Sequence, residues 1–131
     1  MKRDNWTIVK ESKHLIELGV DVKTHDMYHE KIAHGLGEPF KWETFVGQNA
    51  AIMNDLFSYR NGYTLPCWSL GALIDLMKPI DGKTYSITGT LDGSAFVQFE
   101  DVTIFAAQEK TTFESVYEMV CWLLESNYLK Q

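Results

Sequence analysis

Residues 65–79 constrain the fold more than any other part of the chain, because they read as a helix with a signal at each end. Pro66 lacks an N–H group and suits the entry to a helix, and Ser69 can cap the following turn. Pro79 cannot continue a helix and ends it. A helix of about nine residues is marginal alone, so its apolar face must be buried. That face consists of Leu70, Leu73, Ile74 and Met77.

The pattern changes after residue 83 to the alternation that is typical of a half-buried strand. Two such runs flank the turn sequence Leu-Asp-Gly-Ser. A three-residue loop, 91–93, would pair Ile87 with Val97 and Tyr85 with Phe99. This keeps both apolar sets on one face, whereas a two-residue loop would not. We therefore predict a hairpin with the three-residue loop.

A third strand and a long helix complete the C-terminal half of the chain. Residues 101–107 alternate again and predict the last strand of an antiparallel meander. Thr111 and Glu114 form a capping box, and the helix that it opens is expected to end near residues 126–127. We expect the apolar stripe of this helix to pack against the helix of 65–79, with Trp68 buried in one core.

The N-terminal half is predicted with less local information. Residues 6–18 have helical spacing, and Gly19 can close the last turn in the left-handed conformation. Residues 24–41 show no sustained periodicity; we predict a short helical turn near 26–32, then a loop. Residues 42–59 are predicted to form a second helix. If the chain has a mobile segment, it is expected within 24–41.

The length of 131 residues fits one domain, and the hydrophobic share of 45% suffices for a core. The predicted fold is therefore α+β, a single domain spanning 1–131. It has about four helices and a three-stranded antiparallel meander before the C-terminal helix.

Charge and cysteine content narrow the function classes. The formal net charge is −6, and only two residues are arginines, which argues against direct nucleic-acid binding. An acidic mimic of nucleic acid remains an alternative. Cys67 and Cys121 are expected to be buried free thiols in a reducing compartment, Cys67 being the better candidate for a reactive one. The charged start and the lack of a long apolar segment predict a cytoplasmic chain without membrane attachment.

The densest group of candidate ligands lies at residues 24–30. His25 and His29 are four apart, which on a helix places both imidazoles on one face, as a zinc site requires. His34 could add a third ligand. The sequence does not have the zincin pattern, because Glu30 follows the second histidine. A small metal-dependent or acid–base enzyme using His25, His29 and Glu30 is therefore an alternative function, and no cofactor is predicted.

Aromatic residues and one arginine gather in the middle of the chain. Trp42, Tyr59, Arg60 and Tyr63 are of the types that protein interfaces enrich. Phosphate-binding glycine loops and nucleophile motifs are absent from the sequence. The first functional hypothesis is therefore an interaction domain that binds a protein partner or forms a homo-oligomer, with these four residues as interface candidates.

Three segments carry a family resemblance. They are Leu15 to Met27, the run Pro-Cys-Trp-Ser-Leu-Gly-Ala-Leu at 66–73, and Tyr-Glu-Met-Val-Cys-Trp-Leu-Leu-Glu at 117–125. Together they resemble a family of small uncharacterised proteins carried by prophages and conjugative elements of gut anaerobes, over most of the chain. The resemblance implies accessory cargo of a mobile element, and it implies no activity or site residue.

Overall fold

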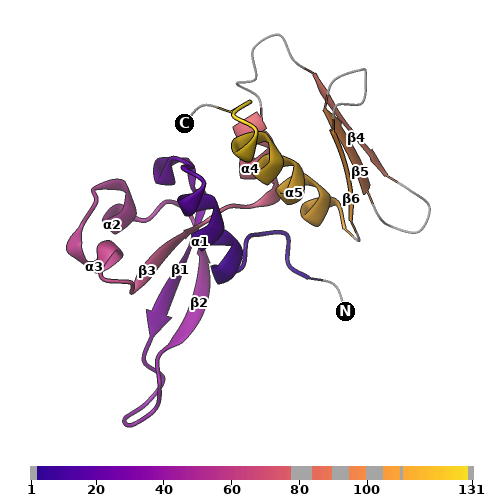
Figure 1. Cartoon of the computed structure of the whole chain (residues 1–131). Coiled ribbons are helices and arrows are strands. Elements are labelled where there is room, and N and C mark those ends of the chain that lie inside the picture. Colours follow the sequence, from indigo (N-terminus) through magenta and orange to yellow (C-terminus); the bar gives the residue numbers. More distant parts are fainter. Residues whose placement is uncertain (1–2, 78–83, 90–94, 100–104, 110, 130–131) are drawn as a thin grey trace. The chain divides into compact units, whose positions relative to one another are not determined.

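The computed structural model describes residues 3–77, 84–89, 95–99, 105–109 and 111–129. These residues belong to two compact units, Met1–Ala72 and Leu73–Gln131, and each unit contains both helices and strands (Figure 1). The predicted α+β class is therefore confirmed. The prediction of a single domain stays a prediction.

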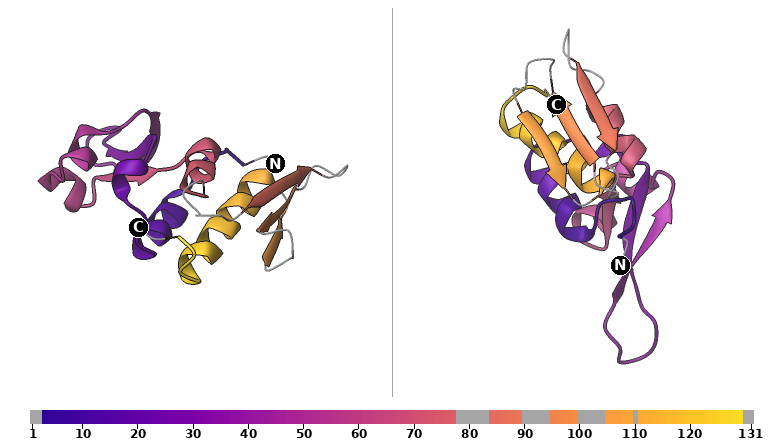
Figure 2. Two further views of the ribbon diagram at one scale, coloured as in Figure 1. Left: turned by 90° about the horizontal axis from the view of Figure 1, so that it is seen from above. Right: turned by 90° about the vertical axis from the view of Figure 1, so that its right-hand side faces the viewer.

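The first unit is built on an antiparallel sheet that was not predicted. Its strands lie in the order β2-β1-β3. The elements of the unit are α1 (Val9–Glu17), η1 (Val22–Thr24), β1 (Met27–Ile32), β2 (Lys41–Val46), α2 (Ala50–Met53), α3 (Phe57–Arg60) and β3 (Thr64–Cys67). The β1–β2 hairpin projects beyond the other elements of this unit (Figure 2).

Two predictions fail in this sheet. The helical turn near 26–32 is wrong, because Met27–Ile32 is a strand with alternating burial. The helix of 42–59 is also wrong, since its first part is β2 and only two short helices follow. Gly47 has φ +114° and Asp55 has φ +57°, and a right-handed helix cannot continue through such residues. The apolar spacing of this segment therefore serves a strand, a turn and two helical turns.

Helix α1 is confirmed with shorter bounds than the predicted 6–18. The carboxylate of Glu11 accepts a hydrogen bond from the Ile8 N–H at 3.0 Å, which satisfies one of the free donors at the helix start. Arg3 holds the same carboxylate at 2.6 Å. Gly19 has φ +95°, as predicted for the residue that closes the helix.

The segment 65–79 divides differently from the prediction. Pro66 lies in β3 opposite Tyr28 and not at a helix entry, a position that suits proline because β3 is an edge strand. Helix α4 spans Leu70–Met77. Ser69 caps it as predicted, its Oγ accepting a hydrogen bond from the Ala72 N–H at 3.2 Å. The Ser69 hydroxyl itself donates to the carboxylate of Asp26.

The second unit holds the predicted meander. Strands β4 (Tyr85–Gly89), β5 (Ala95–Phe99) and β6 (Phe105–Glu109) are antiparallel in that order. Ile87 lies opposite Val97 and Tyr85 opposite Phe99, so the predicted register is confirmed. The turn at 91–93 lies outside the described residues, as do residues 101–104 of the strand predicted at 101–107. Strand β6 ends at Glu109, two residues beyond the predicted end at 107.

Helix α5 spans Thr112–Glu125 and packs on β5 and β6 (Figure 1). The Thr111 Oγ1 accepts a hydrogen bond from the Glu114 N–H at 3.1 Å, and Ser126 follows the last turn. Both predicted ends are confirmed. Val97 and Phe99 are fully buried in this unit.

Trp68 is fully buried, as predicted, and its indole N–H donates to the Thr24 Oγ1 at 2.9 Å. The predicted contact between Trp68 and α5 joins the two units and stays a prediction. Among the helices of the described ranges, none has the length and apolar character to cross a bilayer.

Candidate functional site

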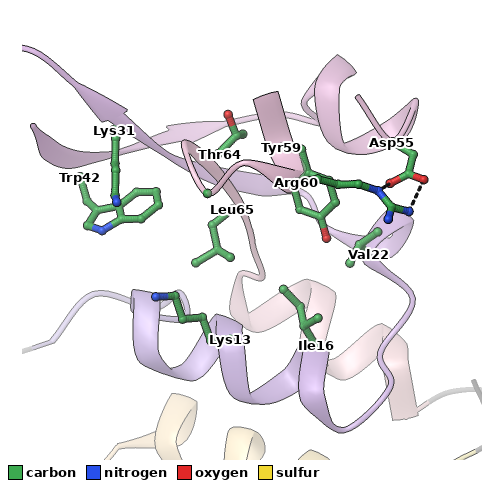
Figure 3. A pocket seen from close by; sticks show the side chains of 11 residues that line it. Lys13, Ile16, Val22, Lys31, Trp42, Asp55, Tyr59, Arg60, Thr64 and Leu65 are labelled. Carbon is green, nitrogen blue, oxygen red and sulfur yellow. Dashed lines mark hydrogen bonds and ion pairs between the residues drawn. The ribbon is translucent and has the colours of Figure 1, made fainter. Parts of the chain in front are cut away.

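A pocket of about 660 Å³ lies in the first unit, between α1 and one face of the sheet (Figure 3). Its volume falls in the range of roughly 300–1,000 Å³ that is typical of ligand sites. Lys13 and Ile16 of α1 form one wall, and Leu65 of β3 points into the pocket from the other. Lys13 and Ile16 are three residues apart, which places them on one side of a helix.

One end of the pocket is formed by an indole and two ammonium groups. Lys31 of β1 and Trp42 of β2 lie directly opposite each other in the sheet. The Lys31 Nζ lies 5.1 Å from the centroid of the indole, within cation–π distance. The Lys13 side chain reaches the same end from α1 (Figure 3).

The other end is formed by α3 and the turn before it. The guanidinium of Arg60 donates two hydrogen bonds to the Asp55 carboxylate, at 2.7 and 2.5 Å. These hydrogen bonds lower the pKa of Asp55 and raise that of Arg60. Burial, with the nearby Asp55 carboxylate, raises the pKa of Tyr59, so this phenol keeps its proton and can donate a hydrogen bond.

The pocket is positively charged, although the chain carries a net charge of −6. Lys13, Lys31 and Arg60 line it, with Asp55 as the carboxylate among its described lining residues. Asp55 is already paired with Arg60. In the described part of the chain, no ion pair includes Lys13 or Lys31. Two ammonium groups are therefore available to an anion.

Three of the four predicted interface residues, Trp42, Tyr59 and Arg60, line this pocket. Tyr63 lies beside it, since its carbonyl oxygen accepts a hydrogen bond from the Lys31 N–H at 2.8 Å. Its ring meets that of Phe40 at a centroid distance of 6.0 Å. The structure thus brings the four residues around one site from β2, α3 and the segment before β3.

Sequence reasoning missed Lys13 and Lys31. Lysines are usually solvated, and no motif distinguished these two among the ten in the chain. Lys31 acquires its place only through the pairing of β1 with β2. Residues 26–32, which include Lys31, were predicted to form a helical turn, and their alternation of burial appears only in the structure.

The three candidate metal ligands do not converge. His25 precedes β1, and its two ring nitrogens lie 2.6 Å from the Val22 carbonyl oxygen and 2.9 Å from the Asn49 N–H. Since a carbonyl only accepts and an N–H only donates, Nδ1 carries the proton and Nε2 accepts. Burial lowers the pKa of His25. This imidazole is a neutral link between η1 and the start of α2.

His29 is also a neutral link. Its Nε2 donates to the Thr7 carbonyl oxygen at 2.8 Å, and its Nδ1 accepts from the Thr44 hydroxyl at 2.8 Å. Burial lowers its pKa. Glu30 is its neighbour in a strand and therefore lies on the opposite face of the sheet. His29 and Glu30 do not share a site.

His34 is exposed, with its Nε2 3.9 Å from the Glu43 carboxylate. The helical spacing behind the metal hypothesis is wrong because the segment is a strand. Within the described ranges, no three His, Cys, Asp or Glu side chains are grouped as metal ligands would be.

Cys67 is a buried thiol, as is Cys121. The Sγ of Cys67 donates to the Thr7 carbonyl oxygen at 3.3 Å. Burial raises its pKa to about 12, and a thiol that keeps its proton is a poor nucleophile. The expectation of buried free thiols is supported, and Cys67 is not placed for catalysis.

Comparison with known proteins adds no relative. No family model, curated protein or solved structure matches the chain.

Proposed function

We propose that this chain is a protein-interaction domain whose pocket binds an acidic side chain of a partner protein. The observation that carries the proposal is the pair of ammonium groups, Lys13 and Lys31, at the Trp42 end of the pocket. Neither has an ion-pair partner among the described residues. A carboxylate there would gain two charge-assisted contacts beside an apolar wall.

Charge distribution supports an anion over a cation or a neutral ligand. A carboxylate is attracted by both Lys13 and Lys31, whereas a cation would be repelled by both. The chain as a whole is acidic, so the pocket is a local exception to its charge.

Exposed apolar side chains around the pocket support a protein partner over a small metabolite. Beside the Trp42 end, Phe40 is 55% and Tyr63 43% exposed. Beside the Arg60 end, Phe57 is 78% exposed at the start of α3. Aromatic residues around an anchoring pocket are typical of protein interfaces.

The family resemblance gives this proposal its setting. A partner would then be a protein of the mobile element or of its host, met in the cytoplasm. A second copy of this chain is a particular case of such a partner.

The test is selection of a displayed random peptide library on the purified chain. We expect enrichment of peptides that contain Asp or Glu. A synthetic copy of the most enriched peptide should bind at least tenfold more weakly to the Lys13→Glu/Lys31→Glu variant, because two attractive charges become repulsive. Titration calorimetry measures the dissociation constant.

Lys10→Glu is the matched control, since Lys10 is an exposed lysine of the same helix that does not line the pocket. This variant replaces one lysine with glutamate, as each of the two substitutions in the double variant does. It should change the dissociation constant less than twofold. Enrichment without acidic residues, or equal binding to the double variant and the wild type, would contradict the proposal.

A further inference from the structure

The two edges of the first sheet differ. Strand β3 forms one edge and is packed by α1, α2 and α3, and it contains Pro66, which has no N–H group to offer. Strand β2 forms the other edge. Among the described elements, its main contacts are with β1 alone, and it contains no proline. An uncovered edge strand offers free N–H and C=O groups to a further strand.

The hydrogen bonds identify which groups of β2 are free. The Lys31 N–H donates to the Tyr63 carbonyl oxygen, away from β2. Lys31 and its opposite residue Trp42 are therefore a non-hydrogen-bonded pair, and the N–H and C=O of Trp42 point away from β1. By the alternation of a strand, the same holds for Thr44 and Val46. The Gly47 N–H, which donates to the Asp26 carbonyl oxygen at 2.8 Å, confirms this alternation.

The side chains of the same three residues share the face that carries the pocket. Trp42 lines the pocket, and the Thr44 hydroxyl binds His29 on that face. Val46, at the other end of β2, is 86% exposed. A strand added beside β2 would place its own alternate side chains next to Trp42, Thr44 and Val46.

We infer that the partner binds as an additional strand, antiparallel to β2, with an apolar residue opposite Val46 and an acidic residue four positions later opposite Trp42. The inference rests on the proposed function. Opposite residues of an antiparallel pair lie about 5 Å apart, so the acidic residue lies next to Trp42, and its side chain extends across the indole toward the Lys31 ammonium group. The apolar side chain covers Val46, and the partner backbone pairs with the free groups of β2.

The decisive variant is Val46→Pro, tested with the synthetic acidic peptide described above. Proline removes one N–H that points away from β1, so it leaves the β1–β2 hydrogen bonds intact, as Pro66 does in β3. We expect binding to weaken at least tenfold and the melting temperature to change little. Val46→Thr keeps the N–H and the β-branched shape and should weaken binding by less than threefold.

N-methylation of the peptide tests the same pairing from the other side. Methyl groups on the nitrogens of the peptide residues opposite Trp42, Thr44 and Val46 replace the N–H groups that face β2, and they should abolish binding. Methyl groups on the intervening nitrogens point away from β2 and should change the dissociation constant less than twofold. On binding, the amide protons of Trp42, Thr44 and Val46 should gain protection from hydrogen exchange.

The outcomes separate this inference from the proposed function. If Val46→Pro and all N-methylated peptides bind normally while Lys13→Glu/Lys31→Glu does not, strand addition is wrong and the pocket proposal stands. If the lysine variant also binds normally, both are wrong. The β2 edge could instead pair with a second copy of this chain. The protein would then form a concentration-dependent dimer in the absence of peptide, and this result would overturn the inference of an acidic segment.

Discussion

Thr7 joins more buried groups of the first unit than its place before α1 suggests. Its N–H donates to the Trp68 carbonyl oxygen at 2.9 Å, and its hydroxyl oxygen accepts from the Trp68 N–H at 3.0 Å. Its carbonyl oxygen accepts from His29 and Cys67, and its hydroxyl also pairs with that of Ser12. In the described residues, no buried side-chain polar atom lacks a partner. Thr7 thereby fixes the start of α1 against β1 and β3.

This arrangement makes the first unit sensitive to acid. Burial lowers the pKa of His25 and His29 in the folded state, so the unfolded chain takes up protons first as the pH falls below about 6.5. We expect the free energy of unfolding to be at its full value above that pH and to decrease from about pH 6.5 toward the lower pKa of the folded state. Urea unfolding at pH 7.5, 6.5 and 5.5 measures this.

Two exposed histidines serve as controls. His14→Gln and His34→Gln each remove an imidazole that is not buried, and the slope of stability against pH should stay as in the wild type. A free energy of unfolding that is constant or rises from pH 7.5 to 5.5 would show that the two buried imidazoles do not resist protonation.

At the scale of the element, helix ends follow local side chains. Ser69 caps α4, Gly19 closes α1, and Thr111 caps α5. Each cap depends on residues within three positions in the sequence, which explains why these ends could be predicted. Strand β1 has no such signal and depends on partners 9 to 40 residues away.

The contribution of the α5 cap can be measured with Thr111→Ala. The substitution removes the oxygen that accepts from the Glu114 N–H, and the loss of such a cap costs about 1 kcal/mol of stability. Thr112→Ala removes the same atoms one position later, inside the helix, where alanine is the better helix former. Chemical unfolding should therefore show a loss for Thr111→Ala alone, and equal losses in both variants would refute a capping role.

At the scale of the whole molecule, the two units share a helix. The division falls between Ala72 and Leu73, within α4 (Leu70–Met77). A helix this short is not stable by itself, so the single-domain prediction expects the two units to unfold together.

The prediction is one unfolding transition for both units. Incorporation of 5-fluorotryptophan provides a fluorine signal from Trp6, Trp42 and Trp68 in the first unit and from Trp122 in the second. In urea, all four native signals should disappear at one midpoint. A separate midpoint for Trp122 would show that the units unfold independently.

The sequence by itself determined the parts of this protein whose cause is local. The ends of α4 and α5 follow from Ser69 and Thr111, and the pairing of Ile87 with Val97 follows from loop length and alternation. Only the tertiary structure decided the β2-β1-β3 sheet, because residues 42–59 have apolar spacing that suits a helix, and it is the pairing of 41–46 with β1 that makes the first part a strand. The pocket, too, was decided only by the tertiary structure. Lys13, Lys31 and Arg60 come from three elements, and no spacing along the chain reports that folding brings their charges together.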